Sequence, residues 1–151
     1  MKKNIERKIY KEISQYLKDG EVIVIHGARQ VGKTSLMLYI SDNIKTKNTL
    51  YIDLEDPRFL DLCNKGVEEV INYLRARNLN FSKRIFLFID EIQYLNNPSS
   101  FLKLFHDTYK NKIKLIVSGS SSFEIKTKFK DSLVGRTVNF ELFPLSFNEF
   151  L

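Results

Sequence analysis

The sequence predicts an α/β domain in which helices cover a parallel β-sheet. Three observations support this fold class. Short apolar runs rich in β-branched residues alternate with helical stripes along the 151 residues. Residues 27–34 read GARQVGKT, which matches the pattern G-x-x-x-x-G-K-[ST] without a mismatch. A second apolar run, residues 85–89, ends directly in two carboxylates, Asp90 and Glu91.

The first element is an amphipathic helix over residues 4–18. Its apolar residues recur at every fourth position, as Ile5, Ile9, Ile13 and Leu17. Asp19-Gly20 should end it. We expect this helix to lie against the edge of the sheet or against the glycine-rich segment.

The glycine-rich segment lies between a strand and a helix, which favours a phosphate-binding loop (P-loop) over a turn with a surface lysine. The run Val22–Ile25 is typical of a strand buried on both faces, predicted over residues 21–26. Apolar residues at helical spacing predict a helix over residues 34–44. Gly27 and Gly32 would let backbone amides approach phosphate oxygens, and the helix N-terminus adds a partial positive charge. Lys33 could then reach the β- and γ-phosphates, and Thr34 could offer its hydroxyl to Mg²⁺.

Residues 49–54 predict a second strand, parallel to the first. Asp53, Glu55 and Asp56 follow at its end, and we favour a role in capping the loop over contact with a metal. Residues 57–64 are expected to be irregular or a single turn. A helical stripe then begins at Val67 and ends near residue 78.

The apolar run before Asp90 and Glu91 has the form of a Walker B strand. In P-loop proteins the first carboxylate, here Asp90, holds Mg²⁺ through water. The second, Glu91, is placed to polarise the attacking water. The alternative interpretation is an ordinary buried strand whose two acids lie at its end only because that end meets solvent. The presence of the P-loop favours the Walker B interpretation.

The next predicted helix carries Phe101, Leu104, Phe105 and Tyr109, with Ser99 or Ser100 as its N-cap. A strand over residues 113–119 follows. Its Ser118 would face the γ-phosphate if this strand lies between the first strand and the Asp90 strand. The two histidines, His26 and His106, are interpreted as packing or surface residues.

The last third of the chain predicts a short helix over residues 121–128, capped by serines, and a final strand over residues 137–142. Arg136 stands just before that strand. Ser146 and Glu149 form a capping box for a helix that begins in the tail.

Bulk properties narrow the function classes. The length suits one domain, and the single cysteine, Cys63, excludes an intramolecular disulfide and is interpreted as a packing residue. Neither a signal peptide nor an apolar run long enough to cross a membrane is present, so we expect a cytoplasmic protein without a membrane partner. The net charge of +6, with a concentration at Lys126, Lys128 and Lys130, is compatible with a nucleic-acid partner. A solvated lysine-rich surface is the favoured interpretation, because no basic stretch is interleaved with aromatics in a way that suggests base stacking.

Five segments together resemble one family: GARQVGKT, FIDEIQ, the strand ending in SGSSS, LVGR, and the tail PLSFNEFL. The chain is similar to the N-terminal ATPase module of the AAA_14 family of bacterial and archaeal AAA-type ATPases, whose members usually carry a C-terminal DUF4143 domain. The resemblance implies a three-layer P-loop NTPase fold of the ASCE, AAA-like type. Its parallel five-stranded sheet would have the order 5-1-4-3-2.

The resemblance also implies roles for individual residues. Asp90 and Thr34 would hold Mg²⁺, Glu91 would be the catalytic acid–base group, and Ser118 would act as the sensor. Arg136 would be an arginine finger that acts in trans on the nucleotide of a neighbouring subunit, so an isolated monomer should bind ATP and hydrolyse it poorly. The nucleotide would be bound by Gly27, Ala28, Arg29, Gln30, Val31, Gly32, Lys33, Thr34 and Ser35.

Members of this family continue past the PLSF segment into a helical lid and a further domain. We expect both to lie outside residues 1–151, which would then be a fragment or a naturally short relative. The predicted function is ATP hydrolysis that drives a conformational change in a DNA or protein partner. The alternative is a nucleotide-gated interaction module with slow or absent hydrolysis. A GTPase is disfavoured because Asn64-Lys65-Gly66-Val67 lacks the aspartate of N-K-x-D, and a small-molecule kinase because no arginine-rich lid is apparent.

Overall fold

A parallel sheet of five strands forms the centre of the domain. The computed structural model describes residues 2–28, 32–120 and 133–143, with side chains from residue 8 onward. The strand order is β2-β3-β4-β1-β5. Read in reverse it is 5-1-4-3-2, so the predicted order is confirmed. Every neighbouring pair is parallel. The strands are β1 Val22–Gly27, β2 Thr49–Asp53, β3 Ile85–Asp90, β4 Ile113–Ser120 and β5 Thr137–Leu142.

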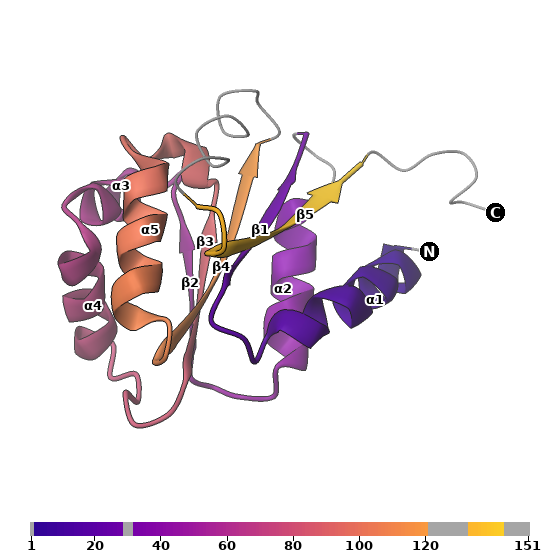
Figure 1. The fold of residues 1–151 in the computed structure, drawn as a ribbon, viewed down its shortest axis with the longest axis horizontal. Coiled ribbons are helices and arrows are strands. Elements are labelled where there is room, and N and C mark those ends of the chain that lie inside the picture. The colour runs from indigo at the N-terminus through magenta and orange to yellow at the C-terminus, as the bar shows by residue number, and fades with distance from the viewer. Residues whose placement is uncertain (1, 29–31, 121–132, 144–151) are drawn as a thin grey trace.

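Helices cover both faces of the sheet, as Figure 1 shows, with α1 and α2 on one face and α3, α4 and α5 on the other. Two short 3-10 turns, η1 and η2, complete the described elements. The helices are α1 Lys2–Ile13, α2 Lys33–Asn43, α3 Pro57–Asn64, α4 Val67–Ala76 and α5 Pro98–Tyr109, and the turns are η1 Ser14–Tyr16 and η2 Ile92–Tyr94.

The two halves of the core follow from the alternation of strand side chains. Val22 and Val24 of β1 pack with the residues of α4 and α5, whereas Ile23 and Ile25 pack with those of α2. All four are at most 2% exposed. A strand buried on both faces requires an unbroken apolar run, which explains why β1 and β3 have one.

The N-terminal helix lies on α2 and reaches the outer strand. The ring of Tyr10 meets that of Tyr39 of α2 edge to face at 5.7 Å, and Tyr16 meets Phe140 of β5 at 5.8 Å. This placement confirms the expected contact with the sheet edge. The predicted single helix is divided, because α1 ends at Ile13 and η1 follows.

Two predictions in the middle of the chain were wrong. Residues 57–64 form the full helix α3, because Asp56 caps it by accepting from Arg58 N at 3.0 Å and Pro57 suits its first position. The N-cap of α5 is Asn97, whose side chain accepts from Ser100 N at 3.1 Å, so neither serine caps the helix. Asn-Pro is thus a start signal here, as Asp-Pro is for α3.

Leu104, expected in the buried stripe of α5, is 54% exposed. The predicted helix over residues 121–128, the lysines at 126, 128 and 130, and the capping box of Ser146 and Glu149 lie outside the described residues. Among the helices that are described, none is both long and apolar enough to cross a membrane.

Candidate functional site

The glycine-rich segment connects the end of β1 to the start of α2. Gly27 is the last residue of β1, and α2 begins at Lys33. Gly32, directly before the helix, has φ +94°, a left-handed conformation that a side chain would strain. The strand, loop and helix thus follow each other as the motif predicts, while residues 29–31 lie outside the described part of the chain.

Lys33 is held at the entrance of this loop. Its side chain is buried, with 5% exposure, and Nζ donates to Gly27 O at 2.7 Å and to Ala28 O at 3.3 Å. Both partners are neutral carbonyl groups, so they accept from two of the three donors of the ammonium group and do not compensate its charge. An anion that enters the loop would supply the missing charge.

Asp90 is the centre of the polar network. The residue ends β3, is 3% exposed, and receives three hydroxyl groups from three different elements. Thr34 Oγ1 of α2 donates to Oδ2 at 2.7 Å, Tyr51 of β2 donates to the same oxygen, and Ser118 of β4 donates to Oδ1. The structure therefore joins the P-loop helix to the Walker B carboxylate directly.

Tyr51 belongs to this network although the sequence analysis did not single it out. It stands on β2, two residues before Asp53, which pairs with Asp90 in the register of β2 and β3. Burial, followed by the hydrogen bond to Asp90, raises the pKa of Tyr51, so the phenol remains a donor at neutral pH. Only the strand order brings Tyr51 beside Asp90, which explains why no local motif indicated it.

Thr34 and Asp90 fit the role of magnesium ligands. Both offer hard oxygen atoms, and they contact each other at the start of α2. Across the described residues, no three or more His, Cys, Asp or Glu side chains gather into a possible metal site. Mg²⁺ usually takes one or two protein ligands and completes its shell with water and phosphate oxygens, which matches this sparse donor set.

Glu91 has an unusual backbone conformation just beyond β3. Its φ of 65° and ψ of 54° are left-handed, which costs a residue other than glycine roughly 1 kcal/mol or more. The amide of Glu91 donates to Ser118 Oγ at 2.9 Å, and its carboxylate accepts from Gln93 Nε2. These two contacts connect Glu91 to β4 and to η2.

Ser118 connects the two acids. It is fully buried on β4, donates to the Asp90 carboxylate and accepts from the Glu91 amide. The predicted position between β1 and β3 is confirmed by the strand order. Its hydroxyl is directed at the acidic pair, and contact with a γ-phosphate stays a prediction.

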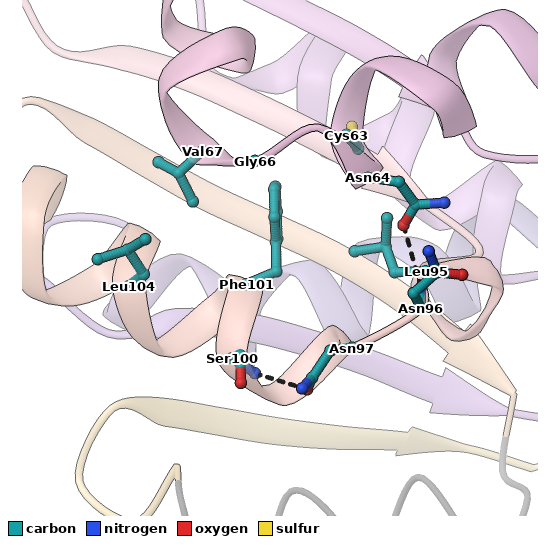
Figure 2. Close-up of a pocket in the computed structure, with 10 residues that line it drawn as sticks. All are labelled: Cys63, Asn64, Gly66, Val67, Leu95, Asn96, Asn97, Ser100, Phe101 and Leu104. Carbon is teal, nitrogen blue, oxygen red and sulfur yellow. Dashed lines mark hydrogen bonds between the residues drawn. The ribbon is translucent and has the colours of Figure 1, made fainter.

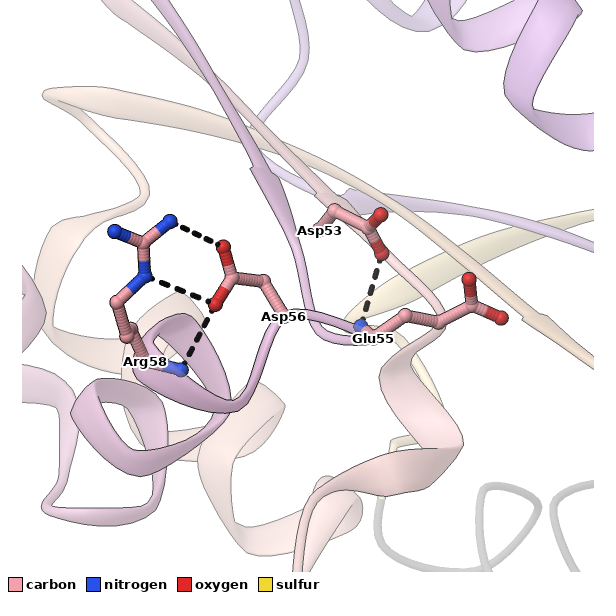
Figure 3. A network of polar contacts seen from close by, with 4 residues as sticks. All are labelled: Asp53, Glu55, Asp56 and Arg58. Carbon is pink, nitrogen blue, oxygen red and sulfur yellow. Dashed lines mark hydrogen bonds and ion pairs between the residues drawn. The ribbon is translucent and has the colours of Figure 1, made fainter.

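The acidic residues after β2 cap the loop, as predicted for Asp53 and Asp56. Figure 3 shows Asp53 accepting from the amide of Glu55, at 2.9 Å, and Asp56 at the start of α3. Asp56 also pairs with the guanidinium of Arg58 at 2.9 Å, which lowers the pKa of the Asp56 carboxyl. The carboxylates of Asp53 and Asp56 therefore bind groups of the same loop and of the start of α3.

Arg136 lies at the opposite end of the strands from the P-loop. Its carbonyl accepts from Val22 N at 2.8 Å, at the start of β1, whereas the P-loop follows the end of that strand. The six residues of β1, at about 3.3 Å each, separate the two. Arg136 Nε donates to Asp107 Oδ1 of α5 at 2.8 Å, which lowers the pKa of that carboxyl. Arg136 is therefore not part of its own chain's site, and action in trans stays a prediction.

A hollow that contains no P-loop residue lies between the α3–α4 turn and the start of α5 (Figure 2). Its lining includes Cys63, Asn64, Val67 and Phe101. Cys63 is 2% exposed, and burial raises the pKa of its thiol to about 12. The thiol stays protonated at neutral pH, which confirms Cys63 as a packing residue.

The sequence pattern of the AAA_14 family, described as an AAA domain, matches residues 19–151. The chain belongs to this family. Both the P-loop and the Asp90–Glu91 pair lie within the matched range, so the fold is that of an AAA-type nucleotide-binding module.

The AAA_14 chain has relatives in archaea and bacteria. An uncharacterized protein of Methanocaldococcus jannaschii is 31% identical over 143 residues, covering 95% of this chain and 31% of the relative. A second protein of that organism is 28% identical over 99% of this chain and 32% of its own length. An uncharacterized Haemophilus influenzae protein is 26% identical over 97% of this chain and 37% of its own. The chain thus spans about a third of each relative.

Solved structures with the same fold include two eukaryotic proteins. A chain of the Drosophila ORC bound to DNA superposes with a TM-score of 0.65 at 14% identity, covering 97% of this chain and 95% of that one. C. elegans PCH-2 superposes with a TM-score of 0.59 at 15% identity, over 94% of this chain and 43% of PCH-2. At these identities the likeness shows the fold alone.

Proposed function

We propose that this AAA_14 domain binds Mg²⁺-ATP and hydrolyses it, and that hydrolysis changes its conformation against a partner. One observation carries the proposal. Asp90 is joined to Thr34 of the P-loop and to Ser118, and Glu91 follows Asp90 in a left-handed turn whose amide donates to the same Ser118. Hydrolysis of a phosphoanhydride needs charge stabilisation and a directed water, and these groups could supply both.

Different residues of the chain would bind the phosphates, hold Mg²⁺ and activate the attacking water. The loop after Gly27, with Ser35 and the amides at the start of α2, would receive the triphosphate, and Lys33 would exchange its carbonyl partners for phosphate oxygens. Thr34 and Asp90 would hold Mg²⁺. When bound, Mg²⁺ neutralises charge on the β- and γ-phosphates. Glu91 would accept a proton from the attacking water, and Ser118 would fix the relative position of the two acids.

Replacing Glu91 by Gln tests whether Glu91 accepts the proton of the attacking water. Removing a general base typically lowers a rate by about 10²–10⁴. We expect phosphate release from Mg²⁺-ATP by Glu91→Gln to fall at least a hundredfold while ATP still binds. Glu69→Gln, which changes an exposed acid on α4, should keep the wild-type rate. Equal rates for wild type and Glu91→Gln would remove Glu91 from the mechanism.

The position of Arg136 supports a second candidate function. Arg136 lies beyond the opposite end of β1 from the P-loop and pairs with Asp107, so it would not serve as a finger at the site of its own chain. The domain would then act as a nucleotide-gated interaction module that hydrolyses slowly until a neighbouring copy, or a partner, supplies an arginine.

DNA is the first partner to test, since the chain has a net charge of +6 and a fold neighbour is solved as a DNA complex. A gated module should bind DNA with an affinity that changes when ATP is added to Glu91→Gln. Anisotropy titrations with and without ATP measure this. An unchanged affinity would argue against gating by nucleotide.

A further inference from the structure

Gln93 forms a two-ended contact beside the proposed catalytic acid. Its Nε2 donates to the Glu91 carboxylate, and its Oε1 accepts from Ser120 N at 3.1 Å. A backbone amide can only donate and an ionised carboxylate can only accept. The two partners therefore require this orientation of the side-chain amide, with the NH₂ group toward Glu91.

The backbone around Gln93 is fixed on both sides. Ile92, at the start of η2, is fully buried, and Leu95 at its end is 5% exposed. Tyr94 N donates to Glu91 O at 3.2 Å and closes the turn. Since these anchors hold η2, Gln93 is presented to the end of β4 without depending on its own side-chain contacts.

Ser120 places the contact beside the P-loop. In the register of β1 and β4, Ser120 is the partner of Gly27, the last residue before the loop. The Gly27 carbonyl in turn accepts from Lys33 Nζ at 2.7 Å. Gln93 therefore connects the Glu91 carboxylate to the strand end that borders the phosphate-binding segment.

We propose that Gln93 is a positioning residue for Glu91: it holds the carboxylate toward the ends of β4 and β1, where the γ-phosphate and the attacking water would lie. This inference rests on the proposed ATP hydrolysis. Its function would require the donated hydrogen bond to Glu91, because the bond to Ser120 alone would only fasten η2 to β4.

Two substitutions separate these roles. Gln93→Glu has nearly the same shape and keeps an oxygen acceptor for Ser120 N, but it cannot donate to Glu91 once ionised. Gln93→Leu loses both contacts. Amide hydrogen exchange at Ser120 reports whether the contact with β4 persists, and thermal unfolding of each variant reports whether the domain is folded.

The decisive experiment measures kcat and KM for phosphate release, together with the Kd for Mg²⁺-ATP, in wild type, Gln93→Glu, Gln93→Leu and Glu91→Gln. We expect kcat to fall about 10- to 100-fold in both Gln93 variants, since a misplaced catalytic group can cost a factor of about 10². The Kd should stay within about twofold. Exchange at Ser120 should increase in Gln93→Leu only.

Wild-type kcat in Gln93→Glu would overturn this inference while leaving the proposed function intact. A loss of kcat confined to Gln93→Leu would do the same, because it would assign Gln93 to fastening η2. If wild type releases phosphate no faster than Glu91→Gln, the proposed hydrolysis fails, and the role of Gln93 fails with it.

Discussion

At the scale of single residues, the site depends on how Asp90 is held. Its carboxylate is almost fully buried and receives hydroxyl groups from Thr34, Tyr51 and Ser118. A buried carboxylate without donors would lose the hydrogen bonds that it makes in water, which is costly. The three hydroxyls therefore satisfy the Asp90 carboxylate in its buried position and hold it beside Thr34.

Tyr51→Phe removes one of these donors without changing the shape of the ring. A hydrogen bond to a charged group contributes about 1.5–3 kcal/mol, and two donors remain. We expect the free energy of unfolding to fall by about 1–2 kcal/mol in urea denaturation. Tyr94→Phe, which alters an exposed ring, is the matched control and should change it by less than about 0.5 kcal/mol. Equal effects of the two changes would show that the Tyr51 hydroxyl does not support Asp90.

At the scale of elements, buried Lys114 and half-buried Arg84 hold the connection between η1 and β1. Lys114 of β4 is fully buried and donates to Asp19 O at 2.9 Å and Glu21 O at 2.5 Å. Arg84, just before β3, donates to Lys18 O at 2.8 Å and Asp19 O at 2.5 Å. These bonds attach the chain that follows η1 to the end of the sheet opposite the P-loop.

Burial, followed by the charge of Arg84, lowers the pKa of Lys114 to about 8 from its ordinary 10.5. Below pH 8 both the folded and unfolded states carry the charge, and its burial opposes folding fully. Between about pH 8 and 10.5 the folded state loses the proton first, so stability rises with pH.

The difference in unfolding free energy between wild type and Lys114→Met should therefore grow in favour of wild type across that window, by up to about 1.4 kcal/mol per pH unit. Chemical denaturation at pH 7, 8, 9 and 10 measures it. The other ionisable groups are the same in both proteins, so their contribution to the difference cancels. A difference that stays constant with pH would show that Lys114 keeps an ordinary pKa.

Local patterns in the sequence predicted most elements, but not those that depend on partners distant in sequence. The apolar runs of β1 and β3 and the glycine pattern before α2 are local signals, and the structure confirms them. Helix α3 was missed because its start signal, Asp56-Pro57, also reads as a turn. Tyr51 could not be identified as a site residue, because only the strand order brings it near Asp90. Gln93 lies two residues after Glu91, but its second contact, with Ser120 of β4, depends on the fold.

At the scale of the whole molecule, the parallel sheet explains why the site forms where it does. All five strands run in one direction, so Asp53, Asp90 and the end of β4 lie at the same end of the sheet as the P-loop. Ligands of open α/β sheets bind at this end, beyond the carboxyl ends of the strands. Arg136, Lys114 and Arg84 lie at the opposite end of the strands, where their printed contacts are with other parts of the same chain.

We propose that the P-loop binds Mg²⁺-ATP through Lys33, and thermal unfolding with and without Mg²⁺-ATP measures this binding. At about 100 times its Kd, a ligand adds about 2.7 kcal/mol to the unfolding free energy, which corresponds to a rise in Tm of about 5–10 °C for a domain of this size. We predict this rise for wild type and for Lys65→Ala, which removes an exposed lysine of the α3–α4 turn. We predict its loss in Lys33→Ala. An equal rise in Lys33→Ala, or none in wild type, would contradict the claim.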